Sequence, residues 1–150
     1  MSLADSTNGL ASVGNPIQLA LPLPHALQTR IQLHLTILEK SILLFATTAS
    51  SDAPSSGCAL GSFVYALPDR TNPSAPPIST ALYPQSQTLD FATRLAKVLA
   101  RKTGKPTYVG NSVSFSAAGR GGDVEEEMDG FRRIVEVVMA EVEKVRAADK

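Results

Sequence analysis

The sequence predicts an α+β domain: a mostly antiparallel sheet of about six strands, with two main helices packed on one face. Three observations support this fold class. Several segments between residues 17 and 83 read as short strands, and one of them alternates strictly between apolar and polar residues. Two later segments carry apolar residues at helical spacing. The strands are mostly grouped before the helices, which favours an α+β arrangement.

Length and composition fit one globular domain. The chain has 150 residues, of which 43% are hydrophobic, and this is enough for a single core. Its 14 basic and 14 acidic residues balance, and its longest apolar run, residues 42–46, is far too short to span a bilayer. The small and polar residues 1–15 read as a disordered N-terminal tail, so the domain is expected over residues 16–148.

Two features indicate the compartment. No Lys or Arg precedes Arg30, so the N-terminus lacks the pattern of a signal peptide. Cys58 is the single cysteine, which excludes an intrachain disulfide and suits a reducing environment. We therefore expect the protein in the cytoplasm, with the nucleus as a second location.

The first strands are predicted from alternation and turn residues. Residues 17–23 form a short strand that ends in prolines, as edge strands do. Residues 30–38 (RIQLHLTIL) alternate with period two, which predicts a strand with one buried face. Glu39 and Lys40 then make a tight turn into residues 41–48 (SILLFATT), so a β-hairpin is expected.

Two more strands follow, separated by loops. Residues 58–67 (CALGSFVYAL) read as a core strand, in which Gly61 marks a bulge or a close contact. After the Pro-rich loop 68–77, residues 78–83 (ISTALY) read as a further strand. The roles of loops 49–57 and 68–77 are not defined by the sequence.

The pattern then becomes helical. Residues 86–104 are expected to form a helix that is capped by Ser86 or Thr88 and stopped by Gly104. A strand over 106–115 and a loop over 116–122 lead to a long helix from Asp123 to about residue 147. The apolar stripe of this helix is expected to comprise Met128, Phe131, Val135, Val138, Val142 and Val145, widened by Ile134, Val137 and Met139.

The sequence contains no motif for catalysis, metal binding or cofactor binding. One Cys and two His residues cannot make a zinc site of the usual spacing, and G-x-S-x-G is missing. TGK at 103–105 fails as a phosphate-binding loop because Leu99 stands where the first glycine belongs and Pro106 replaces the magnesium ligand. Cys58 lies in an apolar strand and reads as a core residue, and His34 as a surface or interface residue. We expect no catalytic residues, no cofactor and no metal.

A basic cluster is the most distinctive local feature. Residues 91–105 carry five basic and no acidic side chains, whereas residues 123–150 carry nine acidic and five basic ones. A solvated helix face is one interpretation, with Arg101 and Lys102 favoured near the helix C-terminus. Nucleic-acid binding is disfavoured because there is no Trp and only Phe91 and Tyr108 lie near the cluster in sequence. A docking surface for a protein partner is the third interpretation.

One segment carries a family resemblance. Residues 91–113 (FATRLAKVLARKTGKPTYVGNSV) resemble the most recognisable segment of the proteasome assembly chaperone 4 family, in which a helix leads through a small turn into a strand. The earlier PPISTALY and IQLHLTILEKSILLFATTA resemble that family's Ser-Thr strand and early hairpin. The resemblance spans residues 17–145 and departs in longer loops and a longer last helix. The matching residues are Arg94, Leu95, Ala96, Ala100, Arg101, Lys102 and Thr103, with Lys105 in the turn.

This resemblance implies a non-enzymatic chaperone with a six-stranded antiparallel sheet and flanking helices. Members of the family pair with the related assembly chaperone 3 and bind α-type subunits of the 20S proteasome while the α-ring is built. Arg94, Arg101, Lys102 and Lys105 would then form a charged partner-binding surface, which sets orientation and association rate. The alternative function is a small dimeric α+β adaptor or trafficking module unrelated to the proteasome. We expect neither nucleic acid nor membrane as a partner.

The hairpin has more apolar residues than one buried face needs. Residues 42–45 offer Ile42 and Leu44 to one face and Leu43 and Phe45 to the other, and residues 61–67 repeat this surplus with Tyr65. Two helices can cover one face of a sheet, so the second face is expected to be a large exposed apolar patch. We therefore predict a dimer in which Phe45 and Tyr65 contact the partner, and we expect isolated copies to self-associate.

Overall fold

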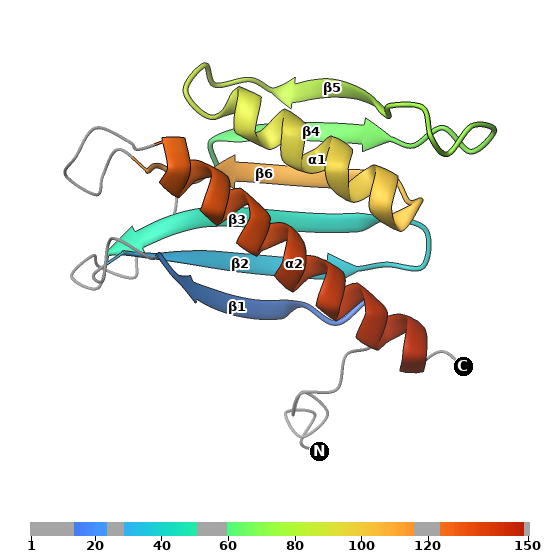
Figure 1. The fold of residues 1–150 in the computed structure, drawn as a ribbon, viewed down its shortest axis with the longest axis horizontal. Coiled ribbons are helices and arrows are strands. Elements are labelled where there is room, and N and C mark those ends of the chain that lie inside the picture. The colour runs from blue at the N-terminus through green and yellow to red at the C-terminus, as the bar shows by residue number, and fades with distance from the viewer. Residues whose placement is uncertain (1–13, 24–28, 51–59, 116–123, 149–150) are drawn as a thin grey trace.

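Six strands form one sheet and two helices lie against it in the computed structural model, which describes residues 14–23, 29–50, 60–115 and 124–148 (Figure 1). In chain order the elements are β1 (Ile17–Pro22), β2 (Thr29–Ile37), β3 (Ile42–Ser50), β4 (Ser62–Leu67), β5 (Ile78–Tyr83), α1 (Leu89–Thr103), β6 (Thr107–Ser112) and α2 (Val124–Ala148). The predicted α+β class is confirmed.

The strand order across the sheet is β1-β2-β3-β6-β4-β5. Every neighbouring pair is antiparallel except β3 and β6, which run parallel. β6 enters between two strands that precede it in sequence, because α1 carries the chain from the edge strand β5 back to the centre. The late strand β6 thereby joins the β1–β2–β3 half of the sheet to the β4–β5 hairpin.

The predicted β2–β3 hairpin is present. Its register pairs Leu35 with Leu44 and His34 with Phe45, and Leu38 N–H donates to the Ser41 carbonyl at 2.9 Å in the connecting turn. The alternation in β2 leaves every second residue at least partly exposed. The residues between them are buried, namely Ile31, Leu33, Leu35 and Ile37. Local patterning therefore sets which face of this strand meets the core.

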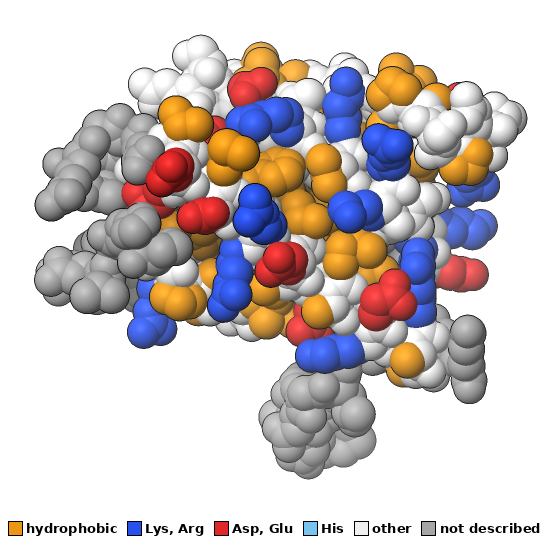
Figure 2. Space-filling model, in the orientation of Figure 1, with side chains coloured by type: hydrophobic (Ala, Val, Ile, Leu, Met, Phe, Trp, Pro, Cys, Tyr) orange, Lys and Arg blue, Asp and Glu red, His pale blue; other side chains and the backbone are white. Residues whose placement is uncertain are grey.

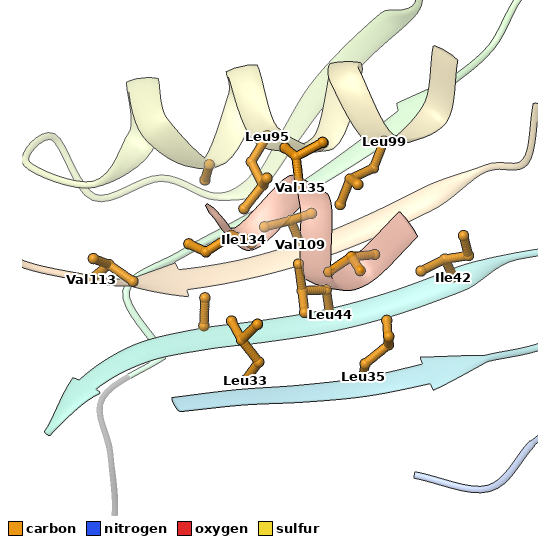
Figure 3. Close-up of a cluster of buried hydrophobic side chains, with 14 of the residues drawn as sticks. Leu33, Leu35, Ile42, Leu44, Leu95, Leu99, Val109, Val113, Ile134 and Val135 are labelled. Atoms are coloured by element: carbon orange, nitrogen blue, oxygen red, sulfur yellow. The ribbon is translucent and has the colours of Figure 1, made fainter. Parts of the chain in front are cut away.

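Both helices cover the same face of the sheet (Figure 1). α1 packs over β4, β6 and β5, while α2 contacts α1 and β2. The core between the layers is aliphatic, and its central side chains converge from both helices and the middle strands (Figure 3). Among its fully buried members are Leu35, Ile42, Leu44, Leu95, Leu99, Val109, Ile134 and Val138.

The apolar stripe of α2 agrees with the predicted one except at its start: Val135, Val138, Val142 and Val145 are buried, and Ile134 is buried with them. Met128, which was placed at its start, is 55% exposed, whereas Ile134 is completely buried. Ile134, Val138 and Val142 succeed one another at intervals of four residues, so they share one face of the helix. The prediction for Met128 was wrong.

The ends of α1 are fixed by hydrogen bonds to the sheet and by a glycine. Thr88 occupies the N-cap, yet its side chain makes no capping bond and instead lies 2.8 Å from the Ser62 hydroxyl of β4. Gly104 has φ of 69° and its N–H bonds to the Ala100 carbonyl, as predicted for a left-handed stop. Nearby, the Arg146 guanidinium of α2 donates to the Thr103 carbonyl at 3.0 Å.

Gly61 is required by a close backbone approach. Its φ is 71°, and a Cβ at this position would collide with the backbone of Asn111 in β6. Gly61 was predicted to mark either a bulge or a close contact, and the structure has the close contact. The register irregularity of β4 lies elsewhere, between Phe63 and Val64. The strand begins only at Ser62, four residues later than predicted.

Several predictions lie outside the described residues. These concern the tail up to residue 13, Cys58, the loop over 116–122 and Asp123, where the last helix was expected to begin. Within the parts of the chain that the structure describes, no helix is long and apolar enough to cross a membrane.

Candidate partner-binding surfaces

The face of the sheet opposite the helices is covered by no described element. Alternation directs Leu43 and Phe45 of β3 to this uncovered face, together with Phe63 and Tyr65 of β4, and all four are half-buried. Tyr108 of β6 joins them because it pairs with Leu43 on one side and Tyr65 on the other. The predicted apolar surplus is therefore real and lies on one surface.

The aromatic side chains of this face form a continuous row across four strands, here called the aromatic row. It runs from His34 to Phe45 with ring centroids 6.4 Å apart, and from Phe45 to Phe63 at 6.0 Å with planes 7° apart. Phe63 and Tyr108 follow at 6.0 Å, and Tyr108 and Tyr65 at 4.7 Å. Such ring contacts hold the side chains in defined positions before any partner arrives.

Gly110 allows the row to cross β6. It pairs with Phe45 on one side and Phe63 on the other, so the two rings meet above a residue that has no side chain. A Cβ on Gly110 would lie 2.5 Å from Phe45 Cδ1 and 2.9 Å from Leu60 Cδ1. The glycine thus makes room for the Phe45–Phe63 stack.

The apolar surface continues toward the edge strand β5. Ile78 is 69% exposed, Leu82 51% and Leu67 38%, and Ile78 is the register partner of Leu67. Exposed apolar residues that adjoin one another in this way mark interaction surfaces more often than isolated ones do. The apolar patch therefore extends from β3 to β5.

Formal charge is nearly missing from the sheet. Of all residues in the six strands, Arg30 at the start of β2 alone is charged. The opposite side of the molecule differs, because basic and acidic side chains gather over α1 and α2 (Figure 2). The two sides of the molecule therefore suit partners of different chemistry.

The predicted basic residues of α1 are not equally available. Arg94 bonds to Asp90 and to Glu127 of α2, each at 3.1 Å, and lies 5.7 Å from the centre of the Phe131 ring. Arg94 therefore links the two helices. The described contacts make it a structural residue of the helix layer, and its predicted partner-binding role is not tested by them.

The remaining basic residues lie at the C-terminal end of α1. Lys105 Nζ donates to the Leu38 carbonyl at 3.3 Å and so reaches across to the β2–β3 turn. Arg101 and Lys102 are exposed in the last turn, where positive charge complements the helix dipole. Both side chains are therefore open to a partner.

The structure separates the predicted site residues into two groups. Phe45 and Tyr65 lie on the uncovered face. Arg94, Arg101 and Lys102 lie on the helix layer, and Lys105 lies just beyond the end of α1, where it contacts the β2–β3 turn. Tyr108, which is near the basic cluster in sequence, belongs to the aromatic row instead. The signal was its alternation with Thr107 and Val109, both of which are buried under the helices.

The loop between β4 and β5 is organised by one carboxylate. Asp69 Oδ1 accepts hydrogen bonds from Thr71 N–H, Thr71 Oγ1 and Asn72 N–H. The Thr71 hydroxyl, followed by the two backbone donors, lowers the pKa of Asp69 below its usual value. This is the behaviour of an Asx turn and indicates local structure rather than chemistry.

No cluster of three or more His, Cys, Asp or Glu side chains that could hold a metal occurs within the described segments. Chemically, the described surfaces offer apolar contact on one side and charged contact on the other.

Comparisons with known proteins bear on the family and the fold of the chain. No curated protein sequence matches the chain. Among solved structures, the fold is similar to that of a chain in the "Crystal Structure of a Novel Chaperone Complex for Yeast 20S Proteasome Assembly", with a TM-score of 0.60 and 16% sequence identity. That match covers 85% of this chain and 96% of the other and shows a shared fold. The sequence profile of the family described as Proteasome assembly chaperone 4 matches residues 30–113, which run from the second residue of β2 to just beyond β6. The chain thus belongs to the proteasome assembly chaperone 4 family.

Proposed function

We propose that this protein is a non-enzymatic chaperone of 20S proteasome assembly, which pairs with an assembly chaperone 3 relative and promotes formation of the α-ring. Membership of the proteasome assembly chaperone 4 family supports the role in assembly. The observation that carries the pairing is the uncovered sheet face, with its aromatic row and its near lack of charge.

The energetics favour a paired state. Burying apolar surface contributes about 25 cal/mol per Å² before the costs of association are subtracted. The rings from Phe45 to Tyr65 already contact one another, so little side-chain freedom remains to be lost on binding. A preorganised aromatic surface of this kind is typical of binding hot spots.

A second surface is needed for the proteasome subunit. Pairing through the sheet leaves the helix layer exposed, and Arg101 and Lys102 protrude from it. We assign these two residues to contact with an α-type subunit, where complementary charge would accelerate association. The protein would then work as a bridge, with the chaperone partner on one side and the proteasome subunit on the other.

Affinity purification from cells followed by mass spectrometry tests this function. The tagged wild-type chain should recover the chaperone 3 relative together with α-type subunits and no mature proteasome. Phe45→Glu should lose the chaperone partner, because it places a charge in the aromatic row. Met128→Glu is the matched control: it adds the same charge at an exposed apolar residue of α2 and should recover both.

Recovery of vesicle or signalling proteins without any proteasome subunit would contradict the proposal. That result would favour the alternative of an adaptor or trafficking module. Recovery of RNA would indicate the nucleic-acid function that the charge distribution disfavours.

A further inference from the structure

Two connections of the chain meet at one end of the sheet, and each carries a lysine. The β2–β3 turn contains Lys40, which is exposed, and the connection from α1 to β6 contains Lys105. Lys105 Nζ donates to the Leu38 carbonyl at 3.3 Å, and Ile42 N–H donates to the Pro106 carbonyl at 2.9 Å. These bonds hold the end of α1 beside the β2–β3 turn, at the right-hand end of the sheet in Figure 1. The cations at this end, here called the cationic corner, are Lys40, Arg101, Lys102 and Lys105.

The chain does not neutralise the charges of this corner. Where cations of the two helices form ion pairs, each has an acidic residue three or four positions earlier on its own helix. No acid stands at those positions before Arg101 or Lys102, and Arg101 instead follows Lys97 by four residues. Like charges at this spacing on a helix repel each other. Among the described residues, Lys40, Arg101 and Lys102 have no ion-pair partner.

The dipole of α1 accounts for only part of this charge. Its effect is confined to the last turn of the helix, whereas Lys40 lies on a different element. The end of α1 is also bonded by other groups, since Gly104 N–H donates to the Ala100 carbonyl at 2.9 Å and the Arg146 guanidinium to the Thr103 carbonyl at 3.0 Å. Unpaired cations that the fold does not require, and that repel one another, favour binding of an anionic partner.

The surroundings of the corner favour the carboxylates of a protein over the phosphates of a nucleic acid. Surfaces that bind single-stranded nucleic acid combine cations with aromatic side chains on which the bases stack. Here Tyr108 belongs to the aromatic row on the uncovered face, and Phe91 is buried at the start of α1. Glu39 is exposed next to Lys40 and would repel a phosphate backbone. A protein segment can instead place a carboxylate opposite each cation.

We propose that the cationic corner binds an acidic segment of the α-type proteasome subunit, and that Lys40 is a contact residue of this interface. The inference rests on the proposed function, which assigns only Arg101 and Lys102 to that contact. It names the chemistry of the partner segment and adds a second structural element. The β2–β3 hairpin also carries Phe45 to the uncovered face, so one hairpin would contribute to both partner contacts.

Substitutions of Lys40 test the proposal in stopped-flow association experiments with the full-length chain and a panel of purified α-type subunits. Lys40→Glu should slow association by about threefold or more at low salt, and added salt should reduce this difference. Lys40→Arg keeps the charge and should associate like wild type. The matched control is Arg132→Glu, which makes the same reversal at an exposed cation of α2 and should change the rate by less than about 1.5-fold.

Glu39→Gln tests the same interface in the opposite direction. It removes the acid beside Lys40 and should speed association by about twofold. Damage to the fold does not accelerate binding, so a faster rate reports the charge of the corner. Both residues lie in an exposed turn, and melting temperatures identify any variant that is unfolded. The other variant then decides.

The outcomes separate this inference from the function on which it rests. Association that is equally fast for wild type, Lys40→Glu and Glu39→Gln would overturn the inference and leave the proposed function intact, as would equal slowing by Lys40→Glu and Arg132→Glu. No association of the wild-type chain with any α-type subunit would overturn both. Tighter binding to a single-stranded RNA of about ten nucleotides than to α-type subunits, lost in Lys40→Glu, would overturn the named occupant.

Discussion

At the scale of single residues, the uncovered face depends on one glycine. Phe45 and Phe63 stand on different strands with β6 between them, and their rings stack because Gly110 has no Cβ to separate them. Gly110 itself adds no side chain to the uncovered face, yet the position of the Phe45 ring depends on it. It determines the shape of a surface formed by its neighbours.

Gly110→Ala should therefore affect pairing more than folding. The new Cβ would displace the Phe45 ring and Leu60, both of which lie at the surface and can rotate away. We expect a loss of about 1 kcal/mol in the free energy of unfolding, at the lower end of overpacking costs. Affinity for the chaperone partner should fall several-fold. Denaturant unfolding and calorimetry measure the two quantities, and unchanged affinity would show that the stack is not part of the interface.

A buried polar network illustrates a second residue-scale feature. Asn111 is fully buried in β6; its Nδ2 donates to the Thr88 carbonyl at 3.3 Å and its Oδ1 accepts from Val113 N–H at 3.2 Å. Ser62 Oγ adds bonds to the backbone of Gln85, at 2.9 Å to both the carbonyl and the N–H. The network ties the start of α1 to the centre of the sheet, so the helix layer and the uncovered face are held in one rigid frame.

At the scale of elements, α2 shows how tertiary packing selects among apolar residues. Ile134→Ala should cost about 2–4 kcal/mol of stability, because it opens a cavity at a completely buried position. Met128→Ala should cost less than about 0.5 kcal/mol, since that side chain is 55% exposed. Thermal and denaturant unfolding of the two variants checks this, and equal losses would contradict the burial of Ile134 and the exposure of Met128.

The basic end of α1 should matter for association rather than for folding. Reversing Arg101 and Lys102 together to Glu changes exposed charges, each of which contributes only about 0–1 kcal/mol to stability. Binding to α-type subunits should slow markedly, and the wild-type rate should fall as salt is added. Stopped-flow association kinetics measure both effects.

Arg132 and Arg133 provide the matched control for that experiment. They are equally basic and exposed on α2, but they lie away from the end of α1. Their double reversal to Glu should leave the association rate close to wild type. Equal slowing by both double variants would indicate a general charge effect instead of a docking surface.

At the scale of the whole molecule, sequence patterning predicted the fold class and the identity of most elements. The alternation in β2 and the apolar surplus of β3 and β4 follow from local periodicity, and the structure has both. The stop at Gly104 also follows from local chemistry, because only the glycine accepts the left-handed conformation without strain. The family resemblance of residues 91–113 is confirmed by the profile match.

Other features depend on contacts between distant segments and could not be predicted locally. The parallel pairing of β3 with β6 joins residues more than sixty positions apart, and the Phe45–Phe63 stack depends on that pairing. The ion pair between Arg94 and Glu127 likewise forms only after both helices have packed.

The central claim is that the uncovered sheet face is the pairing surface of this chaperone. The most direct test is the dissociation constant of the purified chain with its chaperone 3 relative, measured for wild type, Phe45→Glu and Met128→Glu. A charge in the middle of the aromatic row should weaken pairing by at least about thirtyfold, as expected for a hot spot, while the same charge on α2 should change it by less than about twofold. Equal affinities for all three proteins, with melting temperatures preserved, would contradict the claim.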